Sequence, residues 1–201
     1  MSRYFTADLH MGHQNICAYT GRPFGAIDEM DIALVERWNA TVGPDDEVWV
    51  LGDFAMGRIV ESLPLASMMH GHKVLVPGNH DRCWSGHRAK KKDTVDKWIA
   101  EYEAVGFRIV NAPLETTIAG RSIVVNHFPY EGDSTDSERH HSFRPVDRGQ
   151  WLLHGHIHES WRQRGRQINV GVDAWGGMPV SERQISELIN TGPLDLAPLP
   201  W

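Results

Sequence analysis

The sequence HKVLVPGNHD at residues 72–81 joins an apolar run to Gly78, Asn79, His80 and Asp81. A short run rich in aliphatic and β-branched residues that ends at Pro-Gly is typical of a β-strand that stops there. Open α/β sheets place their binding and catalytic residues just beyond the carboxyl ends of such strands. The stretch therefore predicts a strand that delivers an amide, an imidazole and a carboxylate to one edge of a sheet.

Four other apolar runs end in the same manner. They lie at residues 4–7, 48–51, 123–125 and 151–153, and Asp or His side chains follow each of them within a few positions. Because parallel strands bring their carboxyl ends to one edge of a sheet, we expect these side chains to gather there. Together with the amide of the first stretch, the candidate metal ligands are Asp8, His10, Asp53, Asn79, His127, His156 and His158.

Helical and extended patterns alternate through the first half of the chain. Apolar residues recur mostly at helical spacing from residue 28 to the Gly-Pro pair at 43–44, and residues 59–69 and 88–105 are further helical segments. This β-α-β-α-β order favours parallel strands joined by right-handed crossovers, and hence an α/β fold. The second half is expected to hold short strands at 107–110, 114–118, 121–125, 151–153 and 167–170, a long polar loop at 131–150, a helix at 181–190 and a Pro-rich tail.

Length and composition narrow the class of protein. The chain has 201 residues, 41% of them hydrophobic, which suits one domain spanning residues 1–201. Its formal net charge of −6 gives no general attraction to nucleic acid or to anionic membranes, so no extended nucleic-acid surface is expected. We expect a cytoplasmic protein without a membrane partner, because no leader-like or bilayer-spanning apolar stretch is present and two cysteines are too few for a disulfide framework.

The spacing and chemistry of the candidate ligands indicate a metal site. Asp8 and His10 are two residues apart, so on an ideal strand both side chains would point to one face. His156 and His158 repeat this spacing behind Gly155. Three oxygen donors and four imidazoles exceed the shell of one tetrahedral zinc ion and suit two ions that share a bridging ligand. Mixed oxygen and nitrogen donors favour Mn, Fe, Co, Ni or Zn over Mg or Ca. Taken singly, each of these residues is more often a cap or loop residue, but their joint occurrence weakens that alternative.

Five phrases of the sequence carry a resemblance to a known family. They are FTADLHMGHQN at 5–15, VLGDFAMG at 50–57, VPGNHDR at 76–82, VVNHFP at 124–129 and LLHGHIH at 152–158. As a group they resemble the calcineurin-like metallophosphoesterase superfamily, in particular its small bacterial and phage phosphoesterases, over residues 4–180. The resemblance implies a four-layer α/β/β/α sandwich, in which two mixed sheets pack between helices and hold a dinuclear metal site at their strand ends.

The resemblance also implies a role for each candidate residue. Asp8, His10, Asp53 and His158 would hold a first ion, and Asp53, Asn79, His127 and His156 a second, with Asp53 bridging. The two divalent ions, with Mn²⁺ preferred and Fe, Zn, Ni or Co as alternatives, would turn a bridging water into a hydroxide that attacks phosphorus.

Proton transfer and substrate binding have candidates of their own. His80 would protonate the leaving group and Asp81 would orient His80, with a capping role for His80 as the alternative. His13, Arg139 and Arg144 are candidate substrate contacts; their alternatives are a helix cap and an ordinary solvated loop.

Departures from related enzymes suggest the substrate. Phosphoprotein phosphatases continue their Gly-Asp motif with a further acidic residue and an arginine, which residues 54–57 lack, and Arg58 is offset. The chain also lacks the extra DNA-binding domain expected of the repair nucleases. Hydrolysis of small nucleotide-like phosphodiesters, such as 2′,3′-cyclic nucleotides, with some monoesterase activity, is therefore the favoured function. A nuclease and a non-catalytic binding scaffold are the alternatives.

Overall fold

The first sheet brings three of the predicted strand ends together. The computed structural model describes residues 1–135, 137 and 139–201, without the side chains of residues 88–93. The order of strands in this sheet is β10 (Val180–Ser181), β1 (Arg3–Thr6), β2 (Glu47–Val50), β3 (His72–Leu75) and β4 (Phe107–Ile109). Strands β1 to β4 are parallel and β10 is antiparallel to β1. Thr6, Val50 and Leu75 pair in register, so the loops that carry Asp8, Asp53 and Asn79 leave the sheet side by side.

The second sheet supplies the remaining candidates. Its order is β11 (Leu194–Leu196), β8 (Gln163–Gly165), β9 (Gln167–Asn169), β7 (Trp151–His154), β6 (Arg121–Val125) and β5 (Leu114–Ile118). Strands β6, β7 and β9 are parallel and the others pair antiparallel. Val125 pairs with Leu153, so the loops after β6 and β7 also leave together. Strand β11 lies in the Pro-rich tail, where the sequence predicted no strand.

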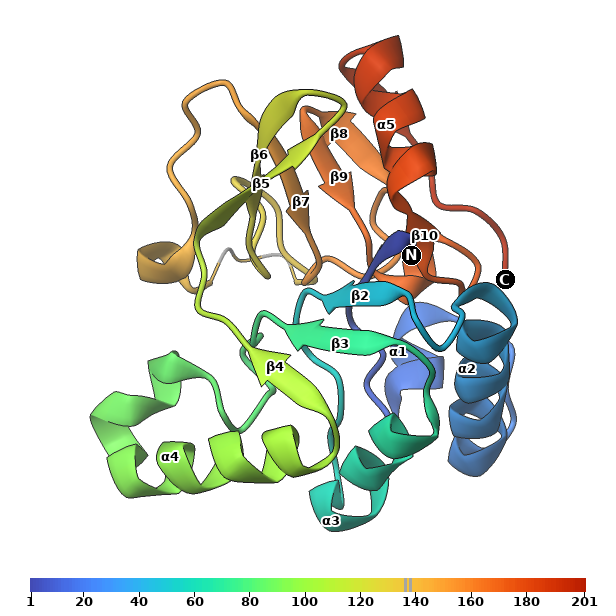
Figure 1. Ribbon diagram of the computed structural model, residues 1–201, viewed down its shortest axis with the longest axis vertical. Helices are drawn as coiled ribbons and strands as arrows, with labels where there is room; N and C mark the ends of the chain where they lie inside the picture. The colour runs from blue at the N-terminus through green and yellow to red at the C-terminus, as the bar shows by residue number, and fades with distance from the viewer. Residues whose placement is uncertain (136, 138) are drawn as a thin grey trace.

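Helices cover the first sheet on one side, and the second sheet lies on its other side (Figure 1). These helices are α1 (Ile16–Thr20), α2 (Ile27–Thr41), α3 (Ile59–Ser62) and α4 (Arg88–Ala104), with 3₁₀ turns at Leu63–Met68, Ser85–His87, His141–Phe143 and Val172–Ala174. The predicted helix at 59–69 changes to 3₁₀ geometry after Ser62, because Pro64 has no N–H to donate to an α-helical hydrogen bond. The last helix, α5 (Glu182–Thr191), begins at a capping box formed by Ser181 and Gln184.

Two apolar cores hold these layers together. Phe5, Leu51 and Val76 from the first sheet pack against Val125 and Leu153 from the second, and each of them is fully buried. On the other face of the first sheet, side chains of α2, α3 and α4 form a separate core. The chain thus has the α/β architecture that the sequence predicted, with two mixed sheets and flanking helices. Among the described residues, no helix combines the length and the apolar character that crossing a bilayer requires.

Candidate metal centre

Asp8 and His10 lie in the loop after β1 rather than on the strand. Strand β1 ends at Thr6, and both residues adopt left-handed backbone conformations, with φ of 56° and 53°. Their N–H groups donate to the carbonyl oxygens of Gly52 and Asp53, each at 3.0 Å. The two side chains do converge, because their ligand atoms lie within 4.8 Å of each other, but strand alternation is not the cause. The left-handed turns, held by the neighbouring loop, direct the two side chains instead.

Asp53 lies between histidines that come from opposite sheets. Its Oδ2 is 3.8 Å from Nε2 of His10 and 3.5 Å from Nε2 of His127, while Oδ1 accepts a hydrogen bond from the backbone N–H of His80 at 2.9 Å. The preceding Gly52 has φ of 92°, and a Cβ there would overlap the ring of His127. Only glycine lets the two loops approach this closely.

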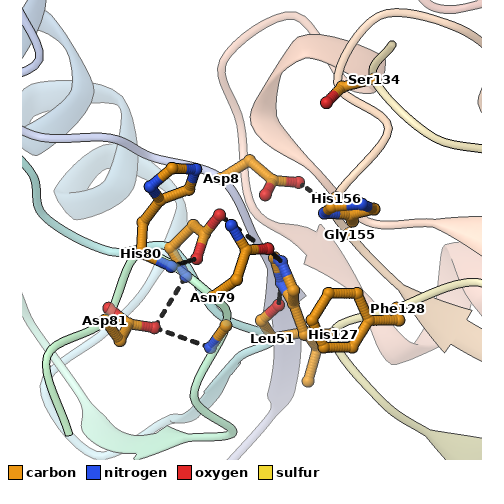
Figure 2. A network of polar contacts seen from close by, with 12 residues as sticks. Asp8, Leu51, Asn79, His80, Asp81, His127, Phe128, Ser134, Gly155 and His156 are labelled. Atoms are coloured by element: carbon orange, nitrogen blue, oxygen red, sulfur yellow. Dashed lines mark hydrogen bonds and ion pairs between the residues drawn. The ribbon is translucent and has the colours of Figure 1, made fainter. Parts of the chain in front are cut away.

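His127 presents a lone pair to oxygen atoms. Its Nδ1 lies 2.7 Å from the carbonyl oxygen of Leu51, which can only accept, so in a neutral ring the proton is on Nδ1. Nε2 then faces Oδ1 of Asn79 at 3.2 Å (Figure 2). It also lies 3.5 Å from Oδ2 of Asp53. Acceptor atoms that face one another repel unless a cation lies between them.

His156 and His158 complete the set from the loop after β7. Both have left-handed backbones, with φ of 75° and 50°. The N–H of His156 donates to Oδ2 of Asp8 at 2.8 Å, and the ring of His158 stacks on that of His10 with 5.0 Å between centroids. Gly155 lies where a Cβ would be only 2.6 Å from the Asp8 carboxylate. The predicted ligands of the two sheets are therefore in mutual contact.

The donor set fits divalent ions. Ligand atoms of Asp8, His10 and His158 lie within 4.8 Å of one another, and so do those of Asp8, Asp53 and His127. Oδ1 of Asp8 and both ring nitrogens of His10 are buried without a hydrogen-bond partner among the described residues. Unpartnered buried polar atoms are unfavourable, and coordination to a cation would satisfy them.

Burial sets the charge of the individual ligands. Burial lowers the pKa of His10 well below its ordinary value, and His158 and Arg22 lower it further, so this ring is neutral, as a metal ligand must be. Burial would raise the pKa of Asp53, but His127 and His80 hold that pKa below its ordinary value. Burial raises the pKa of Asp8 to about 6, and a bound cation would restore its ionised form.

Asp81 does not contact His80 in the way the sequence suggested. Its Oδ2 accepts hydrogen bonds from the N–H groups of Asp53 and Gly78, at 2.8 and 2.9 Å. Its Oδ1 accepts from the N–H of Phe54 and the hydroxyl of Tyr102, each at 3.1 Å. The His80 ring and the Asp81 carboxylate point in opposite directions (Figure 2). The expectation that Asp81 orients His80 is corrected: Asp81 is fully buried and fixes the loops that carry Asp53 and Asn79.

The candidate substrate contacts lie in two places. His13 is near the site, with its ring centroid 5.5 Å from that of His10, and it also lines a surface pocket next to α2. Arg139 and Arg144 come from the loop after β6, and both pair with the carboxylate of Asp133, at 2.6 and 3.1 Å. Their guanidinium groups are thus engaged by the protein, which differs from the expected phosphate clamp.

Sequence reasoning missed three residues around the site, namely Asp173, Arg22 and Asp133. Asp173 accepts from Nδ1 of His158 at 3.2 Å and pairs with the buried Arg22, which also donates to the backbone carbonyl of Asp8. Asp173 follows a strand-like run, so the signal that found the other ligands could have found it. Asp133 contacts His156. It belongs to a polar loop without a periodic pattern, and no local signal marks it.

Comparisons with known proteins agree with this geometry. A family model described as calcineurin-like phosphoesterase matches residues 1–195. The Gene 66 protein of Mycobacterium phage L5 is 36% identical over 196 residues, which cover 93% of each chain. The Gene 66 protein of Mycobacterium phage D29 is 34% identical over 195 residues, covering 93% of this chain and 95% of the phage protein. A crystal structure of a protein of unknown function from Aquifex aeolicus has a similar fold, with a TM-score of 0.65 and 24% identity over 92% of this chain and 98% of the other.

Proposed function

The chain belongs to the calcineurin-like phosphoesterase family, a family of metal-dependent phosphoesterases, and on that basis we propose that it is a dinuclear phosphohydrolase of small phosphodiesters. The observation that carries this proposal is the convergence of acceptor atoms from both sheets. Asp53 lies between His10 and His127, and buried ligand atoms of Asp8 and His10 have no partner among the described residues. Two divalent ions, with Mn²⁺ preferred, fit this donor set.

The candidate residues have different roles in the proposed hydrolysis. Asp8, His10, Asp53 and His158 would hold one ion, and Asp53, Asn79, His127 and His156 the other. When bound, two such ions activate a water molecule and neutralise charge on the phosphoryl oxygens. His80 has an exposed side chain beside this centre, with its ring centroid 5.4 Å from that of His10. We assign to His80 the role of donating the proton that the leaving alkoxide needs.

The surroundings of His13 favour small substrates over nucleic acids. Among the described residues, the pocket that His13 lines combines apolar and acidic side chains with one arginine, Arg58, which is paired with Glu61. The others include Ile32, Met56, Leu65, Asp28 and Asp31. Such a lining suits an uncharged leaving group better than a polyanion, because the carboxylates repel additional phosphates. A cyclic nucleotide carries no charge apart from its one phosphate, so 2′,3′-cyclic nucleotides are suitable substrates, and we expect weaker activity on monoesters.

Hydrolysis assays on metal-reconstituted protein test this function. We expect turnover of bis-p-nitrophenyl phosphate and of 2′,3′-cyclic nucleotides with Mn²⁺, and background rates for Asp53→Ala and Asn79→Ala. Asp147→Asn is the matched control, since Asp147 is exposed and its side chain caps the nearby N–H of Gly149. A higher kcat/KM on oligonucleotides than on cyclic nucleotides would identify a nuclease. An absence of turnover with every divalent metal would identify a binding scaffold.

A further inference from the structure

A loop carboxylate contacts one of the candidate ligands. Oδ2 of Asp133 lies 3.0 Å from Nε2 of His156, and the Asp133 side chain is only 1% exposed. Asp133 is itself held in place. It accepts hydrogen bonds from the backbone N–H and the guanidinium of Arg139, at 2.9 and 2.6 Å, and from the guanidinium of Arg144 at 3.1 Å. A carboxylate fixed by two guanidinium groups has little freedom to leave the imidazole.

This contact decides which nitrogen of His156 is available. A neutral imidazole, which is the form that can bind a metal, carries one proton on one of its two ring nitrogens. A carboxylate can only accept, so the proton lies on Nε2 and donates to Asp133, and the lone pair remains on Nδ1. The ring is packed against Phe128 and His127, with centroid distances of 5.0 and 5.3 Å. Nδ1 is thus the nitrogen with which His156 can bind a cation.

The neighbouring histidine shows the opposite arrangement. Nδ1 of His158 lies 3.2 Å from Oδ2 of Asp173, so the proton of His158 is on Nδ1 and its lone pair is on Nε2. The Gly-His-x-His segment therefore has one carboxylate for each histidine, and the two carboxylates select different ring nitrogens. Asp173 belongs to the packed interior with Arg22, whereas Asp133 belongs to the loop after β6.

We propose that Asp133 is a positioning residue, which fixes the tautomer and ring orientation of His156 and thereby sets the affinity for the second ion. The part that concerns the ion rests on the proposed dinuclear function. Arg139 and Arg144 then serve to anchor Asp133 and do not clamp the substrate. Carboxylates that orient metal-ligating histidines change metal affinity by about 10- to 100-fold when they are removed.

The tautomer is measured first, on the metal-free protein. Long-range ¹H–¹⁵N spectra of the histidine rings are expected to show His156 protonated at Nε2 in the wild type. In Asp133→Ala this preference is expected to be lost, and Asp133→Asn should restore it in part, because the amide oxygen accepts the same proton. Protonation of wild-type His156 at Nδ1 would overturn the proposal without any variant, so the result does not depend on how the variants fold.

Metal binding is measured second. Calorimetric titration with Co²⁺ and elemental analysis are expected to give two ions for the wild type and for Asp147→Asn. In Asp133→Ala, one of the two sites should weaken by about 10- to 100-fold, with a smaller loss in Asp133→Asn. Two ions bound to Asp133→Ala with wild-type affinity would refute the role of Asp133. Fewer than two ions in the wild type would instead refute the dinuclear function, while the tautomer spectra still decide whether Asp133 orients His156.

Discussion

At the scale of single residues, Arg22 connects the candidate metal centre to the interior. Its guanidinium group donates to both carboxylate oxygens of Asp173, at 2.7 and 2.9 Å, and to the carbonyl oxygens of Asp8 and Leu9, each at 2.7 Å. The side chains of Arg22 and Asp173 are completely buried. One guanidinium therefore fixes the backbone of a ligand loop and, through Asp173, the ring of His158.

We expect Arg22→Met to destabilise the protein. The substitution keeps the aliphatic volume but removes the guanidinium that donates to the Asp173 carboxylate and to two carbonyl groups, and leaves the buried carboxylate with His158 alone among the described residues. Removal of one partner of a buried ion pair lowers the free energy of unfolding by about 3–5 kcal/mol. Urea denaturation measures this change. Arg183→Met is the control, because the Arg183–Glu187 pair is exposed and should contribute less than about 1 kcal/mol. Equal effects of the two substitutions would contradict the prediction.

His80→Ala separates proton transfer from metal binding. Since the His80 ring is exposed and its backbone N–H, which the substitution keeps, donates to Asp53, metal content should stay at the wild-type value. We expect kcat on a diester with a poor leaving group to fall by about 10²- to 10⁴-fold, because a positioned acid is lost. Substrates with a p-nitrophenolate leaving group should be less affected, since that group needs no proton. Loss of metal in His80→Ala would show that His80 is a ligand.

The sequence could predict which residues gather at the candidate centre, but it could not predict the partners of the residues around them. All seven predicted ligands lie around one centre because each follows a strand-like run, and this is visible in the sequence. The partners of Asp81 and of Arg139 could not be predicted, because a carboxylate in a loop can accept from any donor that the fold brings near. Asp81 receives donors from three backbone positions and Tyr102, and the arginines meet Asp133 through loop geometry alone.

At the scale of elements, α2 supports the loop that follows β1. Asp31 of α2 is only 8% exposed and accepts from the backbone N–H of Gly12 with both carboxylate oxygens, at 3.1 and 3.0 Å. Gly12 has φ of 75°, and a Cβ there would be 2.7 Å from Cβ of Ser62, at the end of α3. Two helices therefore define the space available to the loop of Asp8 and His10.

The titration of Asp31 gives a pH-dependent stability. Burial raises its pKa from 3.8 to about 6, so between these values the folded chain retains a proton that the unfolded chain releases. The free energy of unfolding contributed by Asp31 therefore falls as the pH rises from about 4 to about 6, and is constant above that range. As the pH rises from about 4 to about 6, the urea midpoint of the wild type should therefore fall relative to that of Asp31→Asn. A difference that does not change with pH would contradict the prediction.

Helices and strands were predicted well where the hydrophobic pattern is strong, and poorly where contacts with neighbouring elements determine the structure. Strands β2, β3 and β6 are largely apolar runs with clear ends, and the amphipathic pattern of α2 identifies it. Strand β11 escaped prediction because Leu194–Leu196 is short and largely exposed, and is specified by pairing with β8. The end of β1 at Thr6 is likewise set by the left-handed turn at Asp8, which neither propensity nor alternation encodes.

At the scale of the whole molecule, the candidate centre joins the two sheets. Asp8, His10, Asp53 and Asn79 follow strands of the first sheet, and His127, His156 and His158 follow strands of the second. The apolar core between the sheets brings these loops together, but the polar atoms at its edge repel one another in the absence of cations. Ion binding should therefore stabilise the packing of one sheet on the other.

Metal removal is expected to lower the melting temperature. At an ion concentration of about 100 times the dissociation constant, binding to the native state alone adds about 2.7 kcal/mol per site to the free energy of unfolding. Thermal unfolding with Mn²⁺ and with a chelator measures the difference, which should grow with ion concentration in the wild type. The melting temperature of Asp53→Ala should respond far less to Mn²⁺, since Asp53 is a candidate ligand of both ions. An equal response of this variant would place the stabilising ions elsewhere.

Five of the seven predicted ligands, namely Asp8, His10, Asp53, His156 and His158, have positive φ, a conformation that costs an L-residue roughly 1–2 kcal/mol and a glycine almost nothing. An exchange to glycine at these positions would relieve that strain, but it would discard a donor atom and leave a cavity where the side chain is buried. At these sites, relief of backbone strain and metal binding oppose each other. Selection for a more stable enzyme must therefore be carried out with the metal ions present.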